Sequence, residues 1–377
     1  MPKPAVMPIE AVTDSLRGLF ESRGFRRTTP GKFEEYDLYV ENRNFLDCEH
    51  LITFMDMEGK LLALKPDVTL SIVKNMPSGT MPAFEKLYYM DEVYRVSHDS
   101  RDYKVLGQLG VEIIGPGDPL SSIECIDLAL EALAQIDPEY ILDISHLGFV
   151  LGLFDSLKLS HTIRTAILGA VHAKSAHTLR NILSEVDIPK EDTAIILELS
   201  ELHGPFNKIM PRVKALCQND AMCEACDELE QINTVVSGLG MSERVFLDFS
   251  VISDLDYYNG LSFLGYVKGV PKAILSGGRY DNLMRRMGKK SNAIGFAINL
   301  SDLKSYRKSG KIHDFDVLIT YEAGCNPAQL LEEQRRLAEK NTVRLEPEAS
   351  ELEQNGISCS KHYRFTAKNK LEEVAGC

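Results

Sequence analysis

The chain lacks any apolar run long enough to cross a membrane, and its first residues, MPKPAVMPIEAV, lack the basic-then-apolar order of an export signal. We therefore expect a cytoplasmic protein with no membrane partner. Positive charge is also scarce, because 42 lysines and arginines face 55 aspartates and glutamates. The resulting net charge of −13 argues against broad non-specific attraction to nucleic acid. Internal repeats and low-complexity tracts are missing too. A length of 377 residues is too great for one ordinary core and indicates two or three globular units.

The eight cysteines also lack the arrangement of a metal site. Cys217, Cys223 and Cys226 contain one Cys-x-x-Cys, but no second pair and no His-x-His lies nearby. The surrounding residues, CQNDAMCEACDELEQI, have the pattern of a helix. We therefore expect no metal and no cofactor, and without an export signal we expect reduced cysteines.

The first 140 residues read as a sheet packed against helices. Apolar positions from Ile9 to Phe20 share one helical face, and Gly24 follows where a helix commonly ends. Alternating apolar runs then predict an antiparallel sheet: FEEYDLYVE, HLITFMDM, KLLALK, KLYYMDEVYRV and YKVLGQLGVEII. Asp118 followed by Pro119 predicts the start of a helix. These patterns favour an α+β fold.

The rest of the chain divides into three parts. Residues from about 150 to 243 predict consecutive helices, which we interpret as a helical insertion. Strand patterns return at 245–251 and 261–267, so the sheet is discontinuous in sequence. After residue 311, DVLIT, a helix capped by Asn326, and TVRLE precede a tail without a clear pattern. We expect a core over residues 1–310 and a small C-terminal α/β appendage or remnant over 311–377.

The stretch VISDLDYYNG, residues 251–260, crowds polar groups at the end of a predicted strand. Asn259 and Gly260 between two apolar runs predict a hairpin turn, since both residues tolerate positive φ. A turn alone does not require the two carboxylates and two phenols before it, which belong to Asp254, Asp256, Tyr257 and Tyr258. A polar ligand is the interpretation that uses them.

Two other segments carry polar side chains with alternative interpretations. Period two places Gln108, Gly110 and Glu112 on one face of a strand, which is either a notch for a small cationic ligand or an exposed face with a glycine bulge. Asp67 before a helical pattern is an N-cap, and with Thr69 it can also face a ligand's ammonium group.

The glycine pair in SGGRYDNL, Gly277 and Gly278, precedes another predicted helix. One interpretation is a strand-to-helix turn. The other is a place where the backbone closely approaches a ligand.

The order of these motifs over residues 8 to 305 resembles the catalytic domain of class II aminoacyl-tRNA synthetases, specifically the histidyl branch. LDYYN and SGGRYD are its most distinctive pieces, and Pro30 resembles the proline of the first motif. The resemblance implies an antiparallel sheet flanked by helices. It also implies a histidine pocket that includes Arg95, the second-motif arginine that holds the α-phosphate of ATP. The other implied histidine-binding residues are Asp67, Thr69, Gln108, Glu112, Tyr257 and Tyr258.

The chain departs from that family at positions that bind or activate ATP. Ser253 replaces a catalytic arginine, Ser97 replaces the second-motif glutamate, and the third motif ends in Ser301 and Asp302 instead of Glu-Arg. Adenylation needs preorganised positive charge around the α-phosphate. A carboxylate at about 4 Å from a triphosphate would instead repel it by several kcal/mol at an effective dielectric near 20. We expect no catalytic residue and no adenylation.

A histidine pocket without the activating arginines resembles the regulatory subunits of ATP phosphoribosyltransferase, a family of histidyl-tRNA synthetase paralogues without aminoacylation activity. The resemblance implies a homodimer within a hetero-oligomer that contains the short-form catalytic subunit. It further implies activation of that subunit and histidine feedback on the first step of histidine biosynthesis, with no tRNA partner. The alternatives are a divergent active histidyl-tRNA synthetase and a free-standing nucleic-acid-binding paralogue.

Overall fold

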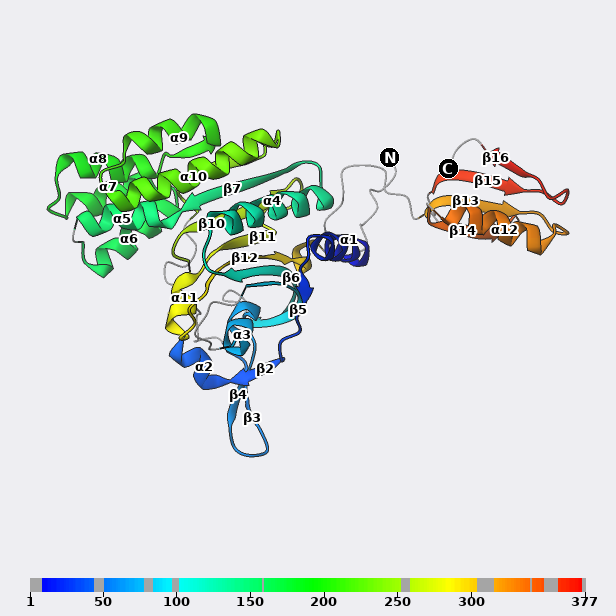
Figure 1. The fold of residues 1–377 in the computed structure, drawn as a ribbon, viewed down its shortest axis with the longest axis horizontal. Coiled ribbons are helices and arrows are strands. Elements are labelled where there is room, and N and C mark those ends of the chain that lie inside the picture. The colour runs from blue at the N-terminus through cyan, green and yellow to red at the C-terminus, as the bar shows by residue number, and fades with distance from the viewer. Residues whose placement is uncertain are drawn as a thin grey trace. The chain divides into compact units, whose positions relative to one another are not determined.

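The structure is a computed structural model that describes residues 9–43, 51–77, 84–96, 102–157, 159–251, 258–303, 315–339, 341–348 and 359–374. It divides into two compact units, Ile9–Lys304 and a second that holds the described residues from 315 onward (Figure 1). The boundary expected near residue 310 falls outside the described ranges and stays a prediction. Within these ranges, no helix combines the length and apolar character needed to cross a membrane.

A mixed sheet of nine described strands forms the centre of the first unit, in the order β1-β5-β6-β12-β11-β10-β7-β9-β8. Pairing is parallel between β1 and β5 and between β7 and β9. The central strands β5, β6, β12, β11, β10 and β7 pair antiparallel, as the alternating runs predict. The bounds are β1 Arg26–Arg27, β5 Glu85–Val96, β6 Tyr103–Gly115, β7 Tyr140–His146, β8 His203–Pro205, β9 Val245–Asp248, β10 Leu261–Val267, β11 Leu275–Arg279 and β12 Asn292–Asn299.

Helices α1 (Ile9–Ser22) and α4 (Pro119–Ile136) pack against each other, and α4 covers one face of the sheet. Helix α4 begins where predicted, because the Asp118 carboxylate accepts a hydrogen bond from the Ser121 amide at 3.2 Å. Gly24 ends the first helix in the left-handed region, with φ of 80°. Both helix predictions are confirmed.

A small sheet and two short helices belong to the same unit. The sheet has the order β2-β4-β3, and all of its neighbours pair antiparallel. Helix α3 shares a buried apolar cluster with β5, β6 and β12, so it packs on the large sheet. The bounds are β2 Phe33–Glu35, α2 Tyr36–Glu41, β3 Thr53–Met55, β4 Leu61–Leu64 and α3 Val68–Asn75.

The segment between β7 and β9 is helical apart from β8, and Figure 1 shows its helices gathered beside β7. Helix α10 packs against α5, α9 and α4, which ties this group to the covered face of the sheet. The bounds are α5 Leu147–Ser156, α6 His161–His172, α7 Ala176–Ser184, α8 Lys190–Leu199, α9 Phe206–Ala215 and α10 Asp220–Gly238.

The hairpin predicted at Asn259 and Gly260 is wrong. Strand β7 lies between β9 and β10, parallel to the first and antiparallel to the second. The Asn259 amide donates to the Arg279 carbonyl at 3.0 Å, and the Gly260 carbonyl accepts from the Leu147 amide at 2.8 Å. Backbone hydrogen bonds therefore join this segment to the end of β11 on one side and to the start of α5 on the other. A local turn signal could not show this, because the partner strand comes from a distant part of the sequence.

The second unit contains a sheet in the order β14-β13-β15-β16 and helix α12. The predicted strand, capped helix and strand are confirmed as β13 (Phe315–Tyr321), α12 (Pro327–Ala338) and β14 (Val343–Pro347). The expectation of a patternless tail is wrong, because β15 (Cys359–Phe365) and β16 (Leu371–Val374) extend the sheet. Their alternation is hard to recognise because polar residues occupy most positions.

One cysteine departs from the expectation of reduced thiols. Cys359, 1% exposed at the start of β15, is disulfide-bonded, and its partner lies outside the described residues. In the ranges that the structure describes, the free cysteines are Cys125, Cys217, Cys223, Cys226 and Cys325. Sequence spacing could not distinguish the two groups, because a disulfide depends on which segments meet in space.

The tight packing of β11 yields the first prediction. A Cβ atom at Gly277 would lie 2.5 Å from the Gly295 carbonyl oxygen and 2.5 Å from the Phe263 ring. We expect Gly277→Ala to lower the free energy of unfolding by about 1 to 3 kcal/mol through overpacking. Gly18→Ala is the matched control, since no atom lies within 4 Å of that Cβ in α1. It should stabilise by about 0.5 to 1 kcal/mol. Equal effects in urea unfolding would contradict the packing argument.

Candidate ligand-binding site

Glu112 on β6 is the centre of the candidate site. Its side chain is buried, with a residue exposure of 2%. The Thr69 hydroxyl of α3 donates to Oε1 at 2.6 Å, and the Tyr280 hydroxyl at the start of α11 (Asp281–Arg286) donates to Oε2 at 2.6 Å. Three elements from distant parts of the sequence therefore converge on one carboxyl group.

The start of α3 brings a second carboxylate to the same place. Asp67 is the N-cap of α3, and its Oδ1 accepts a hydrogen bond from the Leu70 amide at 2.8 Å. The N-cap prediction is confirmed. Arg95 lies beside this turn, because its Nε donates to the Pro66 carbonyl at 3.0 Å. Burial raises the pKa of Asp67, and the hydrogen bond from Leu70 and then the charge of Arg95 oppose that rise.

Glycines create the space for the side chains of the site. Gly295 pairs with Glu112 and Gly278 pairs with Gly295, so the three residues form a row across the sheet. A Cβ at Gly295 would lie 2.0 Å from Glu112 Oε2, and one at Gly278 would lie 2.4 Å from the Tyr258 ring. SGGRYDNL does pass from strand to helix, but the turn falls at Tyr280 and both glycines lie inside β11. Side chains of the protein itself approach their backbone.

A tyrosine ring fills the notch expected above Gly110. Tyr89 on β5 pairs with Gly110, and a Cβ at that glycine would lie 2.4 Å from the Tyr89 hydroxyl oxygen. Burial raises the pKa of Tyr89, and the charges of Glu112 and Asp67 add to that rise. The glycine therefore accommodates an aromatic wall of the site, which sequence reasoning missed because it requires the register of two strands.

The electrostatics of the site favour a cation. Burial raises the pKa of Glu112 to about 8, although the hydrogen bonds from Thr69 and Tyr280 lower it, and the charge of Asp67 adds to the increase. Burial also raises the pKa of Asp67. A bound ammonium or imidazolium group would stabilise both ionised carboxylates. Its N–H groups could also donate to them, which gives charge-assisted hydrogen bonds.

The structure brings together most, but not all, of the predicted site residues. Asp67, Thr69, Glu112 and Tyr258 share the site, with Arg95 at its edge. Gln108 lies farther along the same face of β6, opposite Asp91 and Asn299. Tyr257 lies outside the described residues, as do Ser97, Ser253, Asp254 and Asp256.

Sequence reasoning also missed Tyr280 as a site residue. The SGGRYD motif contained the signal, since two glycines preceded a tyrosine. However, the motif alone does not tell which of its side chains faces Glu112. Tyr280 is 2% exposed, and its hydroxyl reaches the carboxyl group from the end of β11.

The end of β12 carries negative charge at the position predicted to match the third-motif arginine. Ser301 Oγ accepts a hydrogen bond from the Gly107 amide at 3.0 Å. Asp302, in the 3-10 helix Leu300–Leu303, accepts from Asn299 Nδ2 at 2.6 Å and pairs with Lys272 at 2.6 Å. Both residues are held by contacts within the protein, and neither supplies a cation for a phosphate.

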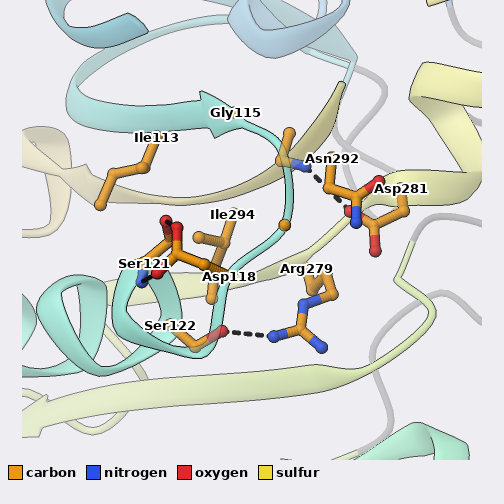
Figure 2. A pocket seen from close by; sticks show the side chains of 11 residues that line it. Ile113, Gly115, Asp118, Ser121, Ser122, Arg279, Asp281, Asn292 and Ile294 are labelled. Carbon is orange, nitrogen blue, oxygen red and sulfur yellow. Dashed lines mark hydrogen bonds between the residues drawn. The ribbon is translucent and has the colours of Figure 1, made fainter. Parts of the chain in front are cut away.

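The opposite face of the sheet carries a separate polar network. Arg279 follows Gly278 in β11 and points to the other side, where Figure 2 shows it reaching Ser122 at the start of α4. Its Nη1 also binds Glu228 of α10 at 2.8 Å, and His146 Nε2 lies 3.1 Å from the same Glu228 oxygen. The small pocket in Figure 2, lined by Arg279, Asp118 and Asn292, lies on this face and is distinct from the Glu112 site.

The fold and motifs match known proteins over most of the chain. A family model described as histidyl-tRNA synthetase matches residues 3–303. A solved structure from Bacillus halodurans C, described as an ATP phosphoribosyltransferase regulatory subunit/histidyl-tRNA synthetase, superposes with a TM-score of 0.73. It shares 21% identity and covers 97% of each chain. Together they place the chain in the histidyl-tRNA synthetase-like class with a class II aminoacyl-tRNA synthetase fold.

Curated relatives narrow the assignment. The ATP phosphoribosyltransferase regulatory subunit of Caldanaerobacter subterraneus is 30% identical over 354 residues, which cover 90% of this chain and 89% of the relative. The subunit of that name from Clostridium botulinum strain Langeland is 29% identical over 323 residues, which cover 82% and 76%. The chain belongs to the family of ATP phosphoribosyltransferase regulatory subunits.

The raised pKa of Glu112 predicts a pH-dependent stability. Between the ordinary pKa near 4.5 and the folded value of about 8, the folded state keeps a proton that the unfolded state releases. Stability should therefore fall as pH rises through this window. Glu112→Gln lacks the titrating group and should not lose stability in this window. Its free energy of unfolding relative to wild type should therefore rise from pH 5 to 8 by on the order of 2 to 4 kcal/mol.

Glu228 supplies a control, because its effect on the free energy of unfolding should depend on pH in the opposite direction. Burial alone would raise its pKa, but the hydrogen bond with His146 and the charge and hydrogen bonds of Arg279 outweigh burial and hold it at about 2. Glu228→Gln should therefore destabilise at pH 7, and its deficit should shrink as pH falls toward 2. Chemical denaturation at a series of pH values measures the free energy of unfolding of both variants. If the free energies of wild type and Glu112→Gln change with pH in parallel, the proposed burial of a protonated carboxyl group is refuted.

Proposed function

We propose that this chain is the non-catalytic regulatory subunit of an ATP phosphoribosyltransferase and binds free histidine at the Glu112 site. The observation that supports it is the buried carboxyl group of Glu112 near Asp67, with Asp302 at the position that we match to the third-motif arginine. The family assignment supports the regulatory role. A solved structure described as the ATP phosphoribosyl transferase (HisG:HisZ) complex from Thermotoga maritima has the same fold, with a TM-score of 0.61, 17% identity, and coverage of 78% of this chain and 98% of that chain.

Histidine suits the chemistry of the site. Its ammonium group and, when protonated, its imidazole carry positive charge and several N–H donors. Asp67 and Glu112 supply acceptors, while the Tyr89 ring lies over Gly110 and the Tyr258 ring lies over Gly278. Because Glu112 carries a proton near neutral pH, binding of a cation should release that proton. Gln108 and Tyr257 remain residues that we propose to contact histidine.

The short-form catalytic subunit is the proposed partner. In this scheme the chain forms a homodimer, since closed two-fold symmetry is the commonest arrangement of identical subunits. The homodimer assembles with catalytic subunits and activates them. Histidine inhibits by binding one state of the assembly more tightly than the other. The net charge of −13 supports the absence of tRNA from this scheme.

Feedback by histidine should depend on Glu112. We expect a short catalytic subunit to form phosphoribosyl-ATP much faster after this chain is added, and histidine to suppress that rate. Glu112→Gln should weaken histidine binding by roughly 2 to 4 kcal/mol, because it removes the charged partner of a desolvated cation. Calorimetric titration of the complex measures the affinity. Glu139→Gln is the control, since that glutamate pairs with exposed Lys268 elsewhere.

The two parts of this proposal fail separately. If the chain leaves the catalytic subunit inactive, the regulatory role is wrong. If it activates that subunit but Glu112→Gln binds histidine like the wild type, the regulatory role stands and the proposed location of histidine is wrong.

The alternative of an active histidyl-tRNA synthetase has a direct assay. We expect the purified chain to show no exchange of labelled pyrophosphate into ATP in the presence of histidine. The reason is that Asp302 places negative charge, balanced by Lys272, where the chemistry needs a cation for the triphosphate. An authentic histidyl-tRNA synthetase serves as the positive control. Exchange that requires histidine would overturn the non-catalytic assignment.

A further inference from the structure

The junction between α9 and α10 contains three thiols in close proximity. Cys217 follows α9, while Cys223 and Cys226 lie one helical turn apart on α10. The sulfur atoms of Cys217 and Cys226 are 3.6 Å apart. Cys223 is exposed, Cys217 is half-buried and Cys226 is 3% exposed. The cluster therefore runs from solvent into the helical core.

Its geometry favours a bond between sulfurs over a metal site. In the described part of the chain, no three His, Cys, Asp or Glu side chains are arranged to hold a metal ion. A disulfide needs two sulfurs at about 2.05 Å. The sulfur atoms of Cys217 and Cys226, at 3.6 Å, are about 1.6 Å farther apart than in that bond.

We propose that Cys217 and Cys226 form a reversible disulfide when the chain meets a low-molecular-weight disulfide, and that exposed Cys223 is the point of entry. All three cysteines of the cluster are free in the structure, so the proposed bond is one that forms by exchange with an added disulfide. The site is independent of the Glu112 cluster and of the proposed function.

The proposed thiol–disulfide exchange takes place in three steps. Cys223 Sγ attacks one sulfur of the small disulfide, and a small thiol leaves with the Cys223 proton. Cys217 Sγ then attacks Cys223 Sγ, and the second small thiol leaves with the Cys217 proton. Finally, Cys226 Sγ attacks Cys217 Sγ and passes its proton to Cys223, which is again a thiol. Two electrons move from the protein to the small disulfide, giving two small thiols.

Burial first, and then the neighbouring thiols of Cys223 and Cys226, raise the pKa of Cys217. Burial raises the pKa of Cys226 as well. The resting pair is therefore two thiols and avoids repulsion between thiolates. The bond would fix the junction next to Asn219, which caps α10 through the Met222 amide at 3.0 Å and also binds the Gly152 carbonyl at 3.0 Å.

Peptide mapping can identify the bond. Trypsin leaves all three cysteines in residues 215–244, and further cleavage after glutamate separates residues 215–224 from 225–228. After the folded chain is treated with oxidised glutathione, we expect these two peptides to remain linked and to separate on reduction. Cys223→Ser should keep the link but form it more slowly, whereas Cys217→Ser should lose it. Cys125→Ser, a buried thiol on α4, is the control and should behave like the wild type.

Each other outcome contradicts the proposal in a specific way. Separate peptides with glutathione retained on Cys223 would mean a simple surface thiol. A link that survives in Cys217→Ser but disappears in Cys223→Ser would assign the bond to the Cys-x-x-Cys pair on α10. Hydrogen exchange provides an independent measurement, because the proposed bond should slow exchange of the amides of residues 216–224 in the wild type and leave Cys217→Ser unchanged.

Discussion

Burial of the Glu112 carboxyl group is the constraint on which the site depends. A buried carboxylate without a partner costs several kcal/mol, so such a group either finds a cation or keeps its proton. Here burial raises its pKa to about 8, although two hydroxyls donate to it and oppose that rise. The surrounding packing maintains this state, because Gly295 lets the carboxyl lie against the backbone and Tyr89 covers the neighbouring strand position. The proposed cationic ligand would have to displace this proton when it binds.

The SGGRYD segment links the two faces of the sheet. Gly278 faces the site and accepts the Tyr258 ring, whereas Arg279 points to the opposite face and binds Ser122 and Glu228. Tyr280 then returns to the site and donates to Glu112. Consecutive residues therefore connect the site to α4 and to α10 of the helical segment. Successive residues of this segment therefore serve opposite faces, because side chains alternate along a strand.

The proposed loss of adenylation depends on the contacts at the end of β12. Asp302 is neutralised by Lys272 and held by Asn299, and Ser301 holds the Gly107 amide. These contacts stabilise the strand end without offering positive charge to a nucleotide. The proposed regulatory function thus uses the amino-acid side of a synthetase-like site and leaves its nucleotide side without the chemistry of adenylation.

The sequence by itself determined the elements whose signals are local. Asp118 and Asp67 marked helix starts, the run from 103 to 115 marked a strand, and DVLIT with the Asn326 cap marked the second unit. Its motifs also predicted the family. Only the tertiary structure decided that β7 separates β9 from β10, that Tyr89 fills the space above Gly110, and that Tyr280 reaches Glu112. These features depend on strand order and register between distant segments, whereas capping and periodicity depend on residues within one or two turns of the chain.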